Sequence, residues 1–160
     1  MGKEQIKSRS RVKEKGEVFT NPREVKAMCD LIPSKIWENI DSTFLEPTCG
    51  TGNFLVEILE RKLRLCKTKQ EIYRALKSIY AIDIMSDNVA EAKVRMKGLI
   101  CEKFGREFVS WTTVNRILNK NILCGDSLQI QAIWECEEKM KGENYGEEKE
   151  NRVQIYTSQE

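Results

Sequence analysis

Residues 44–55 read FLEPTCGTGNFL, which combines the pattern of a buried strand, a glycine loop and the start of a helix. Apolar residues lead to the acid Glu46, and Gly50 and Gly52 follow within a run of small residues. Glycine allows the backbone to turn tightly and to approach a ligand closely. A helix that begins at Asn53 would direct its free N–H groups and positive dipole end at this loop, which favours an anionic group.

The surrounding sequence predicts strands that alternate with helices. We expect strands at 43–46, 79–83 and 121–126, helices at 23–31, 34–40, 53–66, 68–77 and 128–140, a long helix capped by Ser86 or Asp87, and a segment of strand character at 152–157. Strands separated by helices indicate a parallel sheet with crossover connections. The predicted fold class is therefore α/β, with a parallel sheet and flanking helices.

The composition excludes several classes of protein. The chain has 160 residues, a net charge of +2 and no histidine, and its six cysteines are scattered without a CxxC pair. This argues against a zinc site, a secreted disulfide framework, and Ser-His or Cys-His catalysis. No apolar run approaches the roughly 20 residues that cross a bilayer, and the start has no signal-peptide pattern. We expect a cytoplasmic protein with reduced thiols, no membrane contact and no bound metal.

Charge is distributed unevenly along the chain. Residues 3–16 carry six Lys or Arg against two Glu, whereas residues 135–150 are mostly acidic. The basic stretch could contact phosphate, or it is a solvated terminus that is disordered or loosely helical. The sequence therefore divides into a basic, flexible arm at 1–15, a folded domain at 16–141, and a polar linker with a terminal strand at 142–160.

Polar residues follow three of the predicted strands. The glycine loop, Asp83 and Asp126 would meet outside the carboxyl ends of the strands, where ligands bind in such sheets. Asp83 could accept hydrogen bonds from two ribose hydroxyls, and Asp126 could accept one from a purine amine. The loop lacks both the GxGxxG spacing and the Lys-Ser/Thr of a P-loop. The pattern therefore favours a nucleoside that carries a carboxylate over one that carries a phosphate.

Four segments resemble the motifs of S-adenosylmethionine-dependent DNA methyltransferases that act on the adenine amino group. FLEPTCGTGNFL (44–55) looks like the first cofactor motif, and GEVFTNPREVKAMCDLIP (16–33) like the segment before it. YAIDIMSDNVAEAKVRM (80–96) resembles the second motif and NILCGDSL (121–128) the third. Their order is that of the group whose catalytic motif follows the cofactor motifs. The resemblance implies that residues 16–141 form a Rossmann-like cofactor-binding domain, incomplete, with three to four strands.

The resemblance also implies roles toward S-adenosyl-L-methionine. Residues 19 and 20 would line the methionine end, while Glu46 and the loop that follows it would hold the amino and carboxylate groups. Asp83 would bind the ribose with Ile84 against the adenine, and Asp126 would accept from the adenine amine. The complete expected cofactor site is Phe19, Thr20, Glu46, Pro47, Cys49, Gly50, Thr51, Gly52, Asn53, Asp83, Ile84, Asp126, Ser127 and Leu128.

Several of these residues have structural alternatives. Glu46 could cap the helix that begins at Asn53. Asp83 and Asp126 could simply be acids that close turns at strand ends, a common use of Asp. Phe19 could be a plain core anchor.

The family's catalytic motif, an Asn or Asp followed by two prolines and an aromatic residue, is absent. The prolines are Pro22, Pro33 and Pro47, and Asn21-Pro22 is followed by Arg and precedes the glycine loop. We therefore expect no catalytic residue, and a chain that is inactive alone. It would be the cofactor-binding portion of an adenine-specific DNA methyltransferase of the restriction-modification or phage type. The alternatives are an inactive cofactor-binding or interaction module, one half of a split methyltransferase and, less favoured, an enzyme for RNA or protein.

Partners follow from the same reasoning. DNA is expected as a partner only in the context of the full enzyme. A fourth strand should pair against the first, and only RVQIYT (152–157) could take that place. We expect an open sheet edge beside Leu45, through which the chain could self-associate or bind a partner chain.

Overall fold

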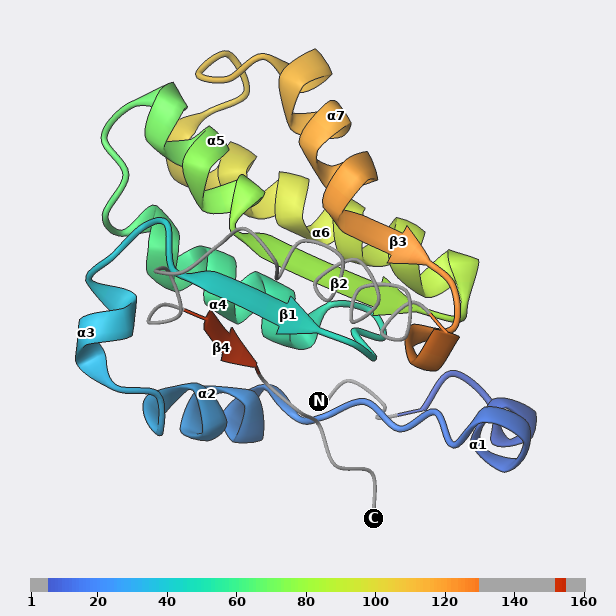
Figure 1. The fold of residues 1–160 in the computed structure, drawn as a ribbon. Helices are drawn as coiled ribbons and strands as arrows, with labels where there is room; N and C mark the ends of the chain where they lie inside the picture. The colour runs from blue at the N-terminus through green and yellow to red at the C-terminus, as the bar shows by residue number, and fades with distance from the viewer. Residues whose placement is uncertain (1–5, 130–151, 155–160) are drawn as a thin grey trace, which may run out of the picture.

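The computed structural model describes residues 6–129 and 152–154 (Figure 1). In chain order the elements are α1 (Arg9–Lys15), α2 (Pro22–Asp30), α3 (Ser34–Trp37), β1 (Thr43–Glu46), α4 (Asn53–Leu63), α5 (Lys69–Lys77), β2 (Ile79–Asp83), α6 (Ser86–Phe104), α7 (Trp111–Asn121), β3 (Ile122–Cys124) and β4 (Arg152–Gln154).

Within the described residues the strands form one parallel sheet in the order β3-β2-β1-β4. Helices α4 and α6 pack against each other and lie behind the sheet in the view of Figure 1. The carboxyl ends of β1, β2 and β3 point to one side of the molecule, where α1 also lies (Figure 1). The α/β class, with a parallel sheet and flanking helices, is therefore confirmed.

One expectation about the sheet is wrong. The edge beside Leu45 is not open, because β4 runs parallel to β1 and Leu45 is in register with Gln154. The predicted fourth strand thus takes its expected place, and β4 forms the outer edge on this side of the described sheet. The remainder of the 152–157 segment lies outside the described residues.

Most predicted boundaries agree with the structure to within a few residues, but the region after β2 differs. Helix α6 begins at Ser86 with Met85 as its N-cap and without a side-chain cap bond, so neither Ser86 nor Asp87 caps it. Helix α7 was not among the expected elements. Residues 1–15 were expected to be disordered or loosely helical, and the structure places a helix over Arg9–Lys15 with Ser8 as its cap. Of the helix expected at 128–140, all but the first two residues lie outside the described part.

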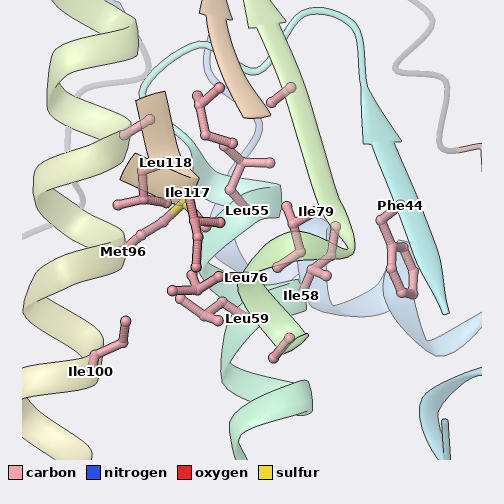
Figure 2. Packing of buried hydrophobic residues seen from close by; sticks show 14 of the residues in the cluster. Phe44, Leu55, Ile58, Leu59, Leu76, Ile79, Met96, Ile100, Ile117 and Leu118 are labelled. Atoms are coloured by element: carbon pink, nitrogen blue, oxygen red, sulfur yellow. The ribbon is translucent and has the colours of Figure 1, made fainter. Parts of the chain in front are cut away.

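The core lies between the sheet and the helices that pack against it (Figure 2). It forms because helices with apolar residues at a period of three to four residues bury that face against alternate residues of the strands. Apolar side chains from β1, β2 and the four helices α4 to α7 form one contiguous buried cluster. The residues labelled in Figure 2 are Phe44, Leu55, Ile58, Leu59, Leu76, Ile79, Met96, Ile100, Ile117 and Leu118.

The cysteines of the described part, which are Cys29, Cys49, Cys66, Cys101 and Cys124, are all free thiols. Burial raises the pKa of Cys29 and of Cys66 to about 11, so both stay protonated and act as small apolar groups. No helix in residues 6–129 is both long enough and apolar enough to span a membrane.

A lysine is buried at the end of α4 that is distant from the glycine loop. Lys62 is 1% exposed, and its Nζ donates to the carbonyl oxygens of Ile40 at 2.8 Å and Ser42 at 2.7 Å. The Phe44 ring centroid lies 5.0 Å from the same nitrogen. These contacts fix the chain that enters β1. Burial lowers the pKa of Lys62 from 10.5 to about 8, because the charged form is poorly solvated there.

We predict that Lys62→Met removes a pH dependence of stability. Between about pH 8 and 10.5 the unfolded chain keeps the Lys62 proton that the folded chain has lost, so the free energy of unfolding of the unmodified protein should rise with pH. Urea denaturation at several pH values measures this slope. Subtracting the slope of Lys62→Met removes the contribution of other groups, and identical slopes would contradict the depressed pKa.

Candidate ligand-binding site

A cavity of about 600 Å³ lies at the carboxyl ends of β1, β2 and β3. Its volume falls in the range of roughly 300–1,000 Å³ that is typical of small-molecule sites. Twelve of the fourteen residues predicted for the site line it, and only Glu46 and Gly52 do not. The twelve are Phe19, Thr20, Pro47, Cys49, Gly50, Thr51, Asn53, Asp83, Ile84, Asp126, Ser127 and Leu128.

Gly50 and Gly52 of the loop have different structural roles. Both have a left-handed backbone, with φ of +49° at Gly50 and +84° at Gly52. A Cβ on Gly50 would lie 3.2 Å from the Phe19 ring, so this glycine lets the ring lie close over the loop. A Cβ on Gly52 would lie 2.8 Å from the Cβ of Ala92 on α6. Gly52 therefore permits α4 and α6 to pack closely, and its role is in packing rather than in lining the cavity.

Backbone hydrogen bonds tie the loop to β2. The Cys49 N–H donates to the Ile82 carbonyl at 2.9 Å, and the Gly50 N–H donates to Oδ2 of Asp83 at 2.7 Å. The Gly52 N–H closes the turn by donating to the Cys49 carbonyl at 2.8 Å. The loop is therefore held by the strand whose carboxyl end forms the next part of the cavity wall.

Both strand-end acids close turns while they line the cavity. Oδ1 of Asp83 accepts from the Met85 N–H at 2.8 Å, and Oδ1 of Asp126 accepts from the Leu128 N–H at 3.0 Å. These contacts are the ones expected if Asp83 and Asp126 serve to close turns at strand ends. A carboxylate oxygen has two lone pairs, so the single bond from Gly50 leaves Oδ2 of Asp83 able to accept from a ligand.

Glu46 lies beneath the loop. It is 1% exposed, and its Oε1 accepts from the Thr48 N–H at 3.2 Å. Helix α4 begins after Gly52, which has no side chain to cap it. Glu46 supports the turn that follows β1, and its contact with a ligand stays a prediction.

Arg95 of α6 supports the glycine loop, a role that no pattern in the sequence predicted. Its Nη1 donates to the Thr51 carbonyl at 2.6 Å and to Oδ1 of Asn53 at 2.8 Å. Nδ2 of Asn53 in turn donates to the Thr20 carbonyl at 2.7 Å. One chain of hydrogen bonds thus joins α6, the glycine loop and the segment before α2.

The cavity has an acidic lining. Its described lining residues include Glu17, Glu24, Asp83 and Asp126, and they include no Lys or Arg. The Glu17 carboxylate is paired with Arg11, and the other three acids still favour a ligand that carries positive charge over one with several phosphates. Burial, with neighbouring Asp83, raises the pKa of the Cys49 thiol far above its ordinary value, so this cysteine stays protonated and is not a nucleophile at neutral pH.

The cavity also contains residues that sequence reasoning missed. All of them lie within the four motif segments at 16–33, 44–55, 80–96 and 121–128, which was the signal for them, although none was singled out. They are Gly16, Glu17, Val18, Glu24, Thr48, Phe54, Met85, Asn88 and Gly125.

Comparison with known proteins gives one partial similarity. The chain is 34% identical over 88 residues to the Type II methyltransferase M.VspI of Vibrio sp. (strain 343). The match covers 54% of this chain and only 18% of that protein. No family model matches the chain, and no solved structure matches it significantly. The similarity supports a relationship to methyltransferases.

Gly52→Ala should lower the free energy of unfolding by about 1 to 3 kcal/mol, because the new Cβ meets Ala92 and the backbone is left-handed. The matched control is Gly98→Ala within α6, where an added Cβ meets nothing within 4 Å. That change should raise the same quantity by up to about 1 kcal/mol. Urea denaturation compares the two variants, and a stabilising effect of Gly52→Ala would contradict the packing role.

Proposed function

We propose that this chain is the S-adenosylmethionine-binding part of an adenine-specific DNA methyltransferase. The observation that carries the proposal is that the glycine loop, Asp83 at the end of β2 and Asp126 after β3 line one cavity, without a Lys or Arg among its described lining residues. The similarity to M.VspI, which is named a methyltransferase, supports methyl transfer. The choice of adenine in DNA rests on the resemblance of the four sequence motifs.

The chemistry of the cavity fits the proposed cofactor part by part. Asp83 can accept from the ribose hydroxyls, and the half-exposed Ile84 can lie against the adenine. Asp126 can accept from the adenine amine. The amino-terminal end of α4 favours the carboxylate, while the acidic lining favours the sulfonium and ammonium charges. The lack of a Cβ at Gly50 lets the Phe19 ring lie close over the loop, where the ring can pack against the methionine end.

When bound, S-adenosylmethionine supplies an electrophilic methyl group that the exocyclic amine of adenine can accept. The residues of this chain would bind and orient the cofactor, and their contribution to rate would be positioning. The groups that hold the target amine are proposed to lie in another segment or in a partner chain, because these 160 residues contain no Asn/Asp-Pro-Pro-aromatic motif. DNA would bind across both parts.

Calorimetric titration tests the cofactor. We expect saturable one-site binding of S-adenosylmethionine, and no comparable binding of ATP, whose phosphates the acidic lining disfavours. Asp83→Asn should weaken binding by about tenfold or more, the equivalent of about 1.4 kcal/mol. The control is Asp41→Asn, an exposed acid that pairs with Arg74 and does not line the cavity. Normal affinity of Asp83→Asn would contradict the ribose role, and tight ATP binding would contradict the charge argument.

Methyl transfer is tested with tritium-labelled cofactor. The purified chain should transfer no label to DNA, because no residue is present to hold and polarise the target amine. Addition of a polypeptide that carries the missing motif should restore transfer to adenine. Transfer by the chain alone would refute the assignment of an inactive part, and transfer to RNA or protein instead of DNA would overturn the substrate class.

A further inference from the structure

Arg11 of α1 joins two segments that are far apart in the sequence. Its Nη1 donates to Oδ2 of Asp87 at 2.7 Å, and its Nη2 donates to Oδ1 of the same carboxylate at 3.1 Å. Its Nε lies 2.7 Å from Oε2 of Glu17, and Nη2 donates to Oε1 of Glu17 at 2.8 Å. One guanidinium thus pairs with the carboxylates of both Glu17 and Asp87, and the Glu17 carboxylate belongs to a residue that lines the cavity.

Asn88 connects this pairing to Asp83. It is 1% exposed, and its Nδ2 donates to Oε1 of Glu17 at 2.6 Å and to Oδ1 of Asp83 at 3.3 Å. Its Oδ1 accepts from Nζ of Lys7 at 2.9 Å and from Nη2 of Arg11 at 3.4 Å. The cations on one side and the carboxylates on the other therefore fix which way the amide faces.

The arrangement has an energetic reason. Glu17 is 8% exposed and Asp83 is 9% exposed, and both carboxylates accept from the same amide. A buried carboxylate that loses its cation is strongly unfavourable. Without Arg11, Glu17 would compete with Asp83 for Asn88 or move toward water. In the first case Oδ1 of Asp83 loses Asn88 as a donor. In the second case Asn88 loses its stronger acceptor, which lies at 2.6 Å, and its amide can turn away from Asp83. Both changes alter the direction in which Oδ2 of Asp83 faces the cavity.

We propose that Arg11 and Asn88 are positioning residues for the ribose of the ligand, and that they act through the Asp83 carboxylate. The inference rests on the proposed function, since it concerns the same site. It assigns α1 a place behind the wall of the cavity, where Arg11 supports the lining residue Glu17. The basic side chains of α1 are therefore not all available to contact phosphate, because Arg11 is directed at Glu17 and Asp87.

The test compares two ligands, S-adenosylhomocysteine and its 2′,3′-dideoxyribose analogue, by calorimetric titration. Arg11→Gln and Asn88→Leu should each weaken the first by about fivefold or more, the loss expected when an oriented hydrogen bond is impaired. Neither should change the already weaker binding of the analogue, which has no hydroxyls for Asp83. Arg11→Lys should recover part of the affinity. Arg11→Gln should add no further loss to Asp83→Asn.

The matched control is Arg9→Gln, an exposed cation on the same helix, which should leave both affinities unchanged. Equal losses for both ligands in Arg11→Gln would show a general structural effect and overturn the inference. If the unmodified protein binds normally and Arg11→Gln leaves both affinities unchanged, the inference is overturned while the proposed function stands. Failure of the unmodified protein to bind either ligand would overturn the proposed function, and the inference with it.

A second readout needs no ligand. The Gly50 N–H donates to Oδ2 of Asp83, so its hydrogen exchange reports whether that carboxylate is held in place. Exchange of this amide, followed by NMR, should be faster in Arg11→Gln and Asn88→Leu than in the unmodified protein and in Arg9→Gln. Unchanged exchange in both variants would refute the positioning role without reference to any cofactor.

Discussion

The hydrogen bond from the Gly50 N–H to the Asp83 carboxylate is the constraint on which the cavity depends. It joins the left-handed turn after β1 to the end of β2, so two walls of the cavity are fixed relative to each other. Both partners have further hydrogen bonds. Arg95 donates to the loop, and the Met85 N–H and Asn88 donate to the carboxylate. Such repeated support lets a loop of small residues keep one shape.

Much of this architecture could be predicted because its signals are local. The strands Thr43–Glu46 and Ile79–Asp83 are short apolar runs that end in an acid, and their bounds in the structure are those expected. Two helix starts have capping boxes readable within four residues, Asn21 with Glu24 and Thr68 with Glu71. The meeting of the loop with Asp83 and Asp126 followed from the parallel sheet alone, since parallel strands end at one edge.

The missed features depend on contacts between distant segments. Helix α7 contains Thr112 and Thr113, whose β-branched side chains lower helix propensity, and its buried Val114, Ile117 and Leu118 gain their partners only in the tertiary fold. Asp is a residue type that commonly caps helices, but the carboxylate of Asp87 accepts hydrogen bonds from Arg11 and Lys7 instead. Arg95 reaches the loop across 44 positions. Contacts between residues so far apart in the chain cannot be predicted from a local sequence pattern.

The placement of α1 has a consequence for the order of folding. A helix of seven residues is too short to be stable by itself in water. Its side-chain partners Asp87 and Asn88 follow Arg11 by 76 and 77 positions, at the start of α6. Helix α1, although it precedes β2 and α6 in the chain, can therefore become ordered only after they have docked. Docking of α1 behind the cavity is then a late event, and helix formation in residues 9–15 reports that the start of α6 is already in place.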